Sequence, residues 1–178
     1  MLLSGASIVE RGIIRNLLQA ARQVQPCGVD LSLRRVLRFS PSSMPKLDFD
    51  NARRERPGTV EIPFAGAESV VLEPGAYVVE FNEMVEMPRD CMGQIFARSS
   101  LWRSGAFLTA GVVDAGYGGV LGALLDVRHS AGLELFRNAK LGQIVLHQME
   151  GEVEGYNGVY QGLGNMDGPT ADAVSPER

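Results

Sequence analysis

The sequence predicts a mainly β protein, either a sandwich, a jelly roll or a barrel, that follows an N-terminal helix. From Val60 onward, short apolar runs alternate with turns that contain proline and glycine. Strands at such spacing are typical of these three folds. A chain of 178 residues is long enough for one domain with a sizeable core. We expect a single domain over residues 1–162 and a flexible, polar C-terminal tail over residues 163–178.

The opening segment predicts one amphipathic helix over residues 7–22. Ser7 and Glu10 have the spacing of a capping box. Apolar residues recur at every fourth position, at Val9, Ile13, Leu17 and Ala21. Pro26 and Gly28 then end the helix, and we expect a strand to begin near Val29.

The remaining elements are predicted from apolar runs and from one polar interruption. Residues 38–59 are rich in proline, serine and charge, which indicates a surface loop or excursion. The runs after this excursion predict strands over residues 70–72, 77–81, 84–87, 92–97, 120–127, 133–135 and 144–146.

Charge and hydropathy narrow the function classes. The net charge of −4 argues against a nucleic-acid coat and against a polybasic membrane binder. The N-terminus lacks the pattern of a signal peptide, and no run reaches the roughly 20 apolar residues of a membrane span. We therefore expect a cytoplasmic protein that binds neither nucleic acid nor membrane. The isolated Cys27 and Cys91 predict two buried, reduced thiols.

The first candidate site is the stretch Ala97–Gly105, "ARSSLWRSG". Ser99 and Ser100 can begin a short helix, and Arg98 and Arg103 lie on either side of them. Backbone N–H groups at a helix start, together with hydroxyls and an arginine, suit a phosphate group. The alternative is a capped helix with surface arginines, and this stretch alone favours the alternative.

The second candidate is Thr109–Gly119, "TAGVVDAGYGG", which predicts a strand, a tight hairpin and another strand. A hairpin of small residues lets a flat base approach the main chain. Asp114 at the turn suits a bound water, and Tyr117 suits packing against a sugar. The alternative is an ordinary β-turn that uses Asp and Gly for its backbone geometry.

Two further motifs are weak when taken alone. Gln143 stands at the head of a predicted strand. Residues 156–162, "YNGVYQG", are aromatic and glycine-rich, as a closing flap is, but a packed turn has the same composition.

Together these stretches resemble a known family. The segments "QPCGVDLSL", "ARSSLWRSGAF", "AGVVDAGYGGVL", "GQIVL" and "YNGVYQG" follow the order of motifs in the dUTPase and dCTP deaminase superfamily. The opening helix followed by "QPCGVDLSL" resembles the dCTP deaminase-like branch, to which archaeal dUTPases belong. The resemblance is weakest over residues 38–59 and in the tail.

The resemblance implies a distorted β-barrel or jelly roll of the dUTPase-like β-clip type. It also implies a homotrimer with active sites between subunits, dUTP as the ligand, and Mg²⁺ bound to the triphosphate. Asp30 resembles an early family aspartate that holds the metal through its waters, although a structural aspartate at a strand start fits equally well.

The resemblance also assigns roles to the candidate residues. Phosphates would contact Arg98, Ser99, Ser100 and Gln143. Uracil would lie beside Ala110, Gly111 and Val112, and the deoxyribose would pack on Tyr117. The closing segment would contribute Tyr156, Tyr160 and Gln161.

One position separates deamination from hydrolysis within this resemblance. The deaminases place a proton-shuttling glutamate about ten residues after the hairpin aspartate. Leu124 stands there in this chain, and Asp126 is the nearest acid, about 7 Å further along a strand. The two histidines also lack the pattern of a zinc deaminase.

The sequence therefore predicts hydrolysis of dUTP to dUMP and pyrophosphate, with Asp114 orienting the attacking water. The alternatives are a dCTP deaminase, a bifunctional enzyme, or a non-catalytic deoxynucleotide sensor. Arg103 has two candidate roles, at phosphate or at an interface carboxylate. Val159 stands where the final family motif often has a lysine, so a phosphate contact is either lost or supplied by an arginine elsewhere.

Overall fold

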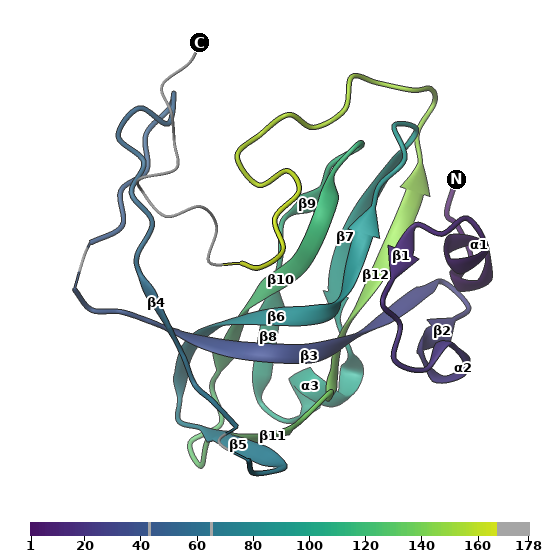
Figure 1. Ribbon diagram of the computed structural model, residues 1–178. Coiled ribbons are helices and arrows are strands. Elements are labelled where there is room, and N and C mark those ends of the chain that lie inside the picture. The colour runs from purple at the N-terminus through teal and green to yellow at the C-terminus, as the bar shows by residue number, and fades with distance from the viewer. Residues whose placement is uncertain (43, 65, 167–178) are drawn as a thin grey trace.

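The computed structural model describes residues 1–42, 44–64 and 66–166, and it is mainly β (Figure 1). The helices are α1 (Gly5–Glu10), α2 (Ala20–Gln23) and α3 (Ser99–Arg103). The strands are β1 (Ile14–Arg15), β2 (Val24–Gln25), β3 (Gly28–Phe39), β4 (Thr59–Glu61), β5 (Ser69–Leu72), β6 (Gly75–Glu86), β7 (Cys91–Ala97), β8 (Ala106–Thr109), β9 (Val112–Val113), β10 (Gly118–Val127), β11 (Leu133–Phe136) and β12 (Lys140–Gln148). The mainly β prediction is confirmed.

Most strands form one curled sheet in the order β8-β10-β6-β3-β12-β7-β9, while β5 and β11 pair separately. The strand β3 joins the two halves of this sheet. Its first half pairs with β12, and its second half pairs with β6 from Leu33 onward, with a register shift between Leu33 and Arg35. Such a shift bends a strand, which allows one strand to serve both halves. Figure 1 shows β3 crossing the molecule beneath β12 and β7.

The core lies inside this curl and is built from alternating residues of the long strands. Val79, Phe81 and Val85 of β6 are fully buried, as are Leu31 and Val36 of β3. The apolar runs 77–81 and 84–87, which were predicted as two strands, fall on the single strand β6, except for Met87, which follows its end. Burial of these side chains is the main favourable term for the fold.

One buried polar network links α2 to this core. The carboxylate of Glu83 accepts hydrogen bonds from the Ser32 N–H at 2.8 Å, the Ser32 hydroxyl at 2.6 Å and the Gln23 amide at 2.6 Å. Gln23 also donates to the carbonyl of Asp30 at 3.0 Å. A buried carboxylate with several donors is stabilising, whereas one without donors is costly.

The predicted helix over residues 7–22 is wrong. Gly12 and Asn16 adopt φ angles of 66° and 61°, which interrupt a right-handed helix at both positions. The helix α1 begins earlier, with Ser4 as its cap accepting from the N–H of Ser7 at 3.2 Å. Ile14 pairs with Val85 in the sheet, so its apolar side chain is buried by a strand and not by a helix face.

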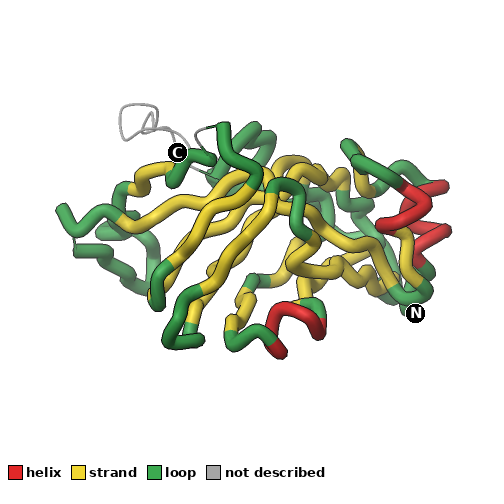
Figure 2. Tube along the Cα trace, turned by 90° about the horizontal axis from the view of Figure 1, so that it is seen from below, coloured by secondary structure: helices red, strands yellow, loops and turns green. Residues whose placement is uncertain are grey.

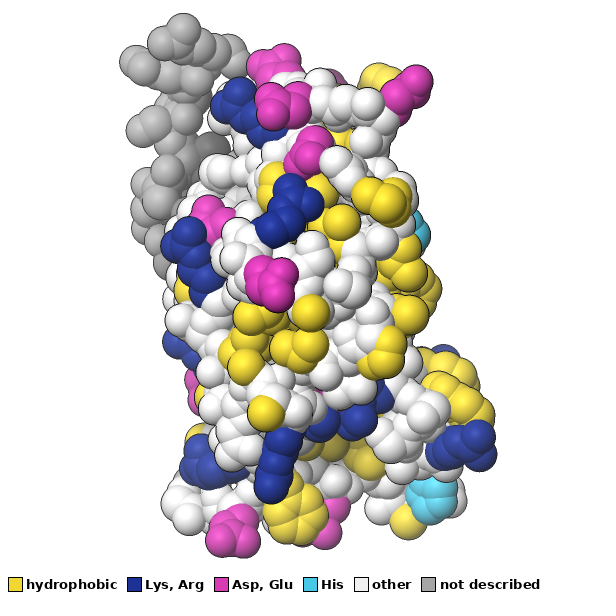
Figure 3. Space-filling view, turned by 90° about the vertical axis from the view of Figure 1, so that its right-hand side faces the viewer, with side chains coloured by type: hydrophobic (Ala, Val, Ile, Leu, Met, Phe, Trp, Pro, Cys, Tyr) yellow, Lys and Arg dark blue, Asp and Glu magenta, His cyan; other side chains and the backbone are white. Residues whose placement is uncertain are grey.

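The two N-terminal helices lie at one side of the molecule (Figure 1). In Figure 2, α1 and α2 occupy one end, and α3 lies below the strands. The face that carries α1 and α2 shows exposed hydrophobic side chains interspersed with basic and acidic ones (Figure 3). No helix among the described residues is long and apolar enough to cross a membrane. Cys91 is buried, but Cys27 is exposed, so one of the two thiols differs from its prediction.

Residues 40–42 and 44–58, between β3 and β4, lie outside the named elements, and a backbone bridge there pairs Lys46 with Glu55. The chain that follows β12 crosses over the top of the sheet, and its described part reaches β10 at Met166 (Figure 1). Its residues 163–166, which we expected to belong to a flexible tail, contact the body of the protein through Met166. Residues 167–178 of that tail lie outside the described residues.

Candidate functional site

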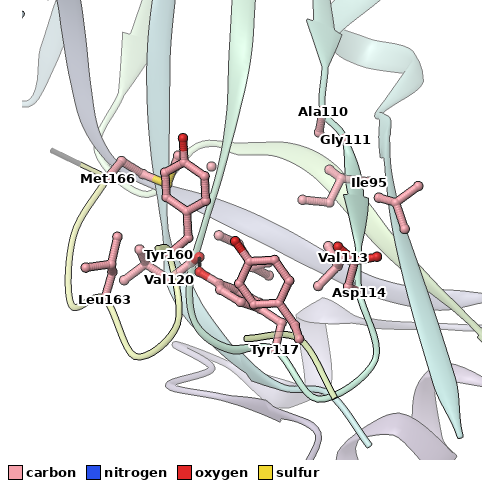
Figure 4. A pocket seen from close by; sticks show the side chains of 14 residues that line it. Ile95, Ala110, Gly111, Val113, Asp114, Tyr117, Val120, Tyr160, Leu163 and Met166 are labelled. Carbon is pink, nitrogen blue, oxygen red and sulfur yellow. Dashed lines mark hydrogen bonds between the residues drawn. The ribbon is translucent and has the colours of Figure 1, made fainter. Parts of the chain in front are cut away.

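A pocket of about 400 Å³ lies between β7, β9, β10 and the C-terminal segment. Its lining is mostly apolar, with a few polar groups, as in small-molecule sites. Figure 4 shows Asp114 and Val113 on one side of this pocket and Tyr160, Leu163 and Met166 on the other. The lining residues are Ile95, Ala110, Gly111, Val112, Val113, Asp114, Tyr117, Val120, Leu121, Gly122, Tyr156, Tyr160, Leu163 and Met166.

The pocket floor is formed where the chain turns from one half of the sheet to the other. The N–H of Tyr117 donates to the carbonyl of Asp114 at 3.2 Å, which closes a tight turn. The strands on either side of the turn do not pair with each other, since β9 pairs with β7 while β10 pairs with β6 and β8. The predicted hairpin is therefore a corner between two parts of the sheet.

Gly116 is required at this turn for two reasons. Its φ of 77° lies in the region that favours glycine. A Cβ at this position would also lie 2.6 Å from the Cα of Gly155, which runs alongside the turn. The close approach lets the N–H of Tyr156 donate to the carbonyl of Ala115 at 2.7 Å.

Tyr117 and Tyr156 form an aromatic pair at the pocket wall. Their ring centroids are 5.7 Å apart and their planes are nearly perpendicular, at 83°. The Tyr117 hydroxyl donates to the carbonyl of Val120 at 2.8 Å. Burial, and then the neighbouring Tyr156, raise the pKa of Tyr117 above its usual value. Tyr117 is therefore held as a neutral, rigid surface on which a ligand can pack.

The carboxylate of Asp114 and the backbone of Gly111 border the pocket and are available to a ligand. Among the described residues, none donates a hydrogen bond to the Asp114 carboxylate, which is exposed. Among the described residues, no atom beyond its two chain neighbours lies within 4 Å of the place where a Cβ of Gly111 would be, so the backbone there borders open space. A carboxylate and a bare backbone in one pocket can orient a water and contact a flat ring.

The C-terminal segment closes the opposite side of the pocket. The side chain of Gln161 accepts from the N–H of Gly118 at 3.1 Å and donates to the carbonyl of Gly116 at 3.0 Å. The N–H of Gly162 donates to the carbonyl of Gly118 at 2.8 Å. Gln161 therefore holds the segment to the turn, without lining the pocket itself.

Arg98 belongs to a second group of predicted residues, which lies outside the pocket. Its Nε is 3.3 Å from one carboxylate oxygen of Asp30, and the Nζ of Lys140 is 2.9 Å from the other. Asp30 is only 1% exposed. The ion pairs fix Arg98 beside the start of α3.

The surroundings of Asp30 do not fit the predicted magnesium role. Both of its oxygens are already paired with cations, and burial leaves no room for a shell of metal-bound water. Among the described residues, no group of three or more His, Cys, Asp or Glu side chains is arranged to hold a metal ion. The alternative interpretation, a structural aspartate at a strand start, agrees with these contacts.

Ser99 and Ser100 follow Arg98 as the first residues of α3, and Gln143 lies on the neighbouring strand β12. Arg98 immediately precedes α3, and its N–H donates to the carbonyl of Leu141 at 3.0 Å. Gln143 pairs with Phe96 of β7 on one side and with Asp30 of β3 on the other. Ser99 and Ser100 are exposed. Arg103 points elsewhere, since its guanidinium stacks 4.6 Å from the ring centroid of Trp102.

Leu124 occupies the position that the deaminase alternative depends on. It lies on β10, two residues after Gly122 of the pocket and on the same face of the strand. The next acid, Asp126, is paired with Arg128 at 2.7 Å. Neither Leu124 nor Asp126 lines the pocket.

The structure therefore divides the predicted residues. Seven of them line one pocket: Ala110, Gly111, Val112, Asp114, Tyr117, Tyr156 and Tyr160. Those predicted to contact phosphate do not line it within one chain. The other seven lining residues were not predicted as site residues: Ile95, Val113, Val120, Leu121, Gly122, Leu163 and Met166. Ile95 belongs to an ordinary alternating strand, and Met166 lies in a polar stretch with no motif, so neither had a distinguishing signal.

Comparison with known proteins gives this arrangement a family. The dCTP deaminase-like family matches residues 5–149. The probable deoxyuridine 5′-triphosphate nucleotidohydrolase of Archaeoglobus fulgidus is 37% identical over 155 residues, which are 87% of this chain and 90% of that protein. The probable deoxyuridine 5′-triphosphate nucleotidohydrolase of Aeropyrum pernix is 34% identical over 165 residues, which are 92% of this chain and 99% of that protein.

A solved structure shows the same fold. The 2′-deoxycytidine 5′-triphosphate deaminase of Agrobacterium tumefaciens superposes with a TM-score of 0.62 at 23% identity, over 82% of this chain and 46% of that one. The long match to the family and the extended identity to its archaeal members agree with the order of motifs along the sequence. This chain belongs to the dCTP deaminase-like family.

Proposed function

We propose that this protein is a dUTP diphosphatase, which hydrolyses dUTP to dUMP and pyrophosphate. The observation that carries the proposal is the Asp114 carboxylate, which borders the pocket without a donor among the described residues. The names of two similar proteins support it further, since the match to this chain covers 90% and 99% of their lengths. Uracil would contact the bare backbone at Gly111, and the deoxyribose would pack against Tyr117.

The reaction needs one oriented water. Asp114 would accept a hydrogen bond from the water and then its proton, while the water oxygen bonds to the α-phosphorus. The bond from that phosphorus to the bridging oxygen breaks, and pyrophosphate leaves with the electron pair. The substrate is Mg–dUTP, in which the metal neutralises phosphate charge. We assign no protein ligand to this ion, because the contacts of Asp30 do not fit one.

We further propose that each complete site is built from two copies of the chain in a homotrimer. Arg98, Ser99, Ser100 and Gln143 lie outside the pocket of their own chain, so a second copy would bring them to the triphosphate. Exposed hydrophobic side chains at Phe96, Phe107 and Val112 support burial of this region between subunits. Arg103 would lie at this contact, through its stacking on Trp102.

Product analysis tests the activity. Purified protein is incubated with Mg²⁺ and either dUTP or dCTP, and dUMP, pyrophosphate and ammonia are followed. We expect dUMP and pyrophosphate from dUTP and no ammonia from dCTP, because Leu124 cannot transfer a proton. Ammonia from dCTP would show that another group replaces the glutamate. Tight dUTP binding without turnover would favour the sensor.

Subunit mixing tests the shared site. We would co-express an Asp114→Asn chain with a Ser99→Ala/Gln143→Ala chain, each inactive by itself. If sites are shared, about a quarter of the sites in random mixtures combine intact groups from two chains, so activity returns. A mixture that stays inactive while light scattering shows trimers would mean that the site lies within one chain.

A further inference from the structure

The loop between β3 and β4 contacts the wall of the pocket through two arginines. The guanidinium carbon of Arg54 lies 5.7 Å from the centroid of the Tyr160 ring, and that of Arg56 lies 5.2 Å from it. Tyr160 lines the pocket from the C-terminal segment. Two segments that are distant in the sequence therefore meet at one aromatic ring.

The ring has few other constraints. Within the described part of the chain, no hydrogen bond holds the Tyr160 hydroxyl, and the backbone contact from Leu163 N–H to the Tyr160 carbonyl is long, at 3.4 Å. The firm anchors of the segment lie elsewhere, at Gln161 and Gly162. The orientation of the ring therefore depends on what stacks against it.

The loop that supplies the arginines is itself ordered by its own contacts. Lys46 and Glu55 exchange two backbone hydrogen bonds of 3.0 Å and form an ion pair of 2.9 Å. The carboxylate of Asp48 accepts from the N–H of Arg53 at 2.7 Å. Arg54 is partly buried. These contacts present the arginines from a folded turn, so the stacking costs little additional chain entropy.

We propose that Arg54 and Arg56 are positioning residues for nucleotide binding, which hold the Tyr160 ring against the ligand by cation–π stacking. This inference rests on the proposed function of the pocket. A cation–π contact at an exposed site changes an affinity by about two- to fivefold, so the loss of the pair is measurable. The polar stretch over residues 38–59 thereby acquires a role that its composition does not indicate.

The two arginines act through the ring and not on the phosphates. In Figure 4, Tyr160 lies across the pocket from Asp114, the group that we place beside the α-phosphorus. Phosphates near Asp114 are therefore on the far side of the ligand from the arginines. Deoxyuridine, which has no phosphate, then depends on the arginines as much as dUTP does.

The test compares two ligands on one set of variants. We would measure the Kd of deoxyuridine and of a non-hydrolysable dUTP analogue for the wild type and for Arg54→Ala/Arg56→Ala. We expect about fivefold weaker binding of both ligands, and a higher KM with kcat changed by less than about twofold. The double lysine variant, Arg54→Lys/Arg56→Lys, should keep most of the affinity because it keeps the positive charges.

Two further variants make the test specific. Arg53→Ala removes an exposed arginine from the same loop and should leave both Kd values unchanged. Tyr160→Leu should lose at least as much affinity as the double alanine variant, because the ring itself lines the pocket, and the combination should lose no more than Tyr160→Leu alone. Thermal unfolding checks that all variants are folded.

Three results would overturn the inference. Unchanged Kd values in the double alanine variant would show that the stacking has no role in binding. A loss confined to the dUTP analogue would mean direct phosphate contacts. Additive losses with Tyr160→Leu would mean that the arginines act independently of the ring. A wild type that binds neither ligand would instead contradict the proposed function, and this inference with it.

Discussion

The buried carboxylate of Glu80, on β6, accepts a hydrogen bond of 2.7 Å from the backbone N–H of Met166 in the C-terminal segment. The same carboxylate pairs with Arg35 at 2.8 Å and with Arg34 at 3.1 Å. Arg34 also donates to the carbonyl of Gly164 at 3.3 Å. Core and pocket wall thus share one charged group.

Replacing Glu80 should therefore be costly. In Glu80→Gln the buried carboxylate becomes an amide, so the partly exposed Arg34 and Arg35 lose their counter-charge, and we expect the free energy of unfolding to fall by about 3 kcal/mol. Urea denaturation measures this. Glu86→Gln is the matched control, because its pair with Arg15 is exposed and worth under about 1 kcal/mol. Equal losses in the two variants would contradict the account.

Asp114→Asn should separate catalysis from stability. The carboxylate is exposed and has no donor among the described residues, so the amide should leave the melting temperature almost unchanged. Turnover of dUTP should fall by about 100-fold or more, since the amide cannot accept the proton of the water. Steady-state kinetics with a thermal melt checks both. Full turnover would mean that another group orients the water.

Substitution by alanine should impair ligand binding at Gly111 and stability at Gly116. A Cβ at Gly111 meets no atom within 4 Å, so Gly111→Ala should fold normally while its methyl group obstructs the ligand and raises KM by about tenfold. Gly116→Ala should lower the melting temperature, because the backbone φ is 77° and the new atom meets Gly155. Melts and dUTP kinetics on both variants test the pair. Normal KM in the Gly111 variant would place the ligand elsewhere.

Because of Tyr117, the free energy of unfolding should fall at alkaline pH. Its pKa is raised in the folded protein, so the neutral phenol is favoured by folding. This contribution is complete below about pH 10 and is lost as the pH rises through the folded pKa, where the partly buried phenol must ionise. Tyr117→Phe should cost about 1 kcal/mol at pH 8, through the lost bond to Val120, and should lose less stability at alkaline pH. Urea unfolding at several pH values tests this, and parallel pH curves for the two proteins would contradict it.

The strands and the motif residues were predictable because their signals are local. Alternation around Val79 and Phe81 indicates a strand whatever it pairs with. The helix over residues 7–22 was predicted wrongly because its fourfold apolar spacing also suits residues that are buried in other ways. Gly12 and Asn16 break the helix with positive φ, and their neighbour Ile14 joins the sheet.

The sequence was a poorer guide to which of these residues lie together in space. Asp114 and Arg98 carry comparable sequence signals, yet one borders the pocket while the other pairs with Asp30. Met166 and Arg56 carry no signal at all, and both reach the pocket wall through contacts with segments far along the chain.

The sequence by itself determined the class of fold, the order of motifs, and the residues available for chemistry, since each depends on side-chain type and short spacing. The tertiary structure alone decided that β9 and β10 form a corner, that Asp30 is neutralised by Arg98 and Lys140, and that the loop after β3 supports Tyr160. Those outcomes depend on which strands pair and which charges are buried together, and such pairings join residues that no local pattern connects.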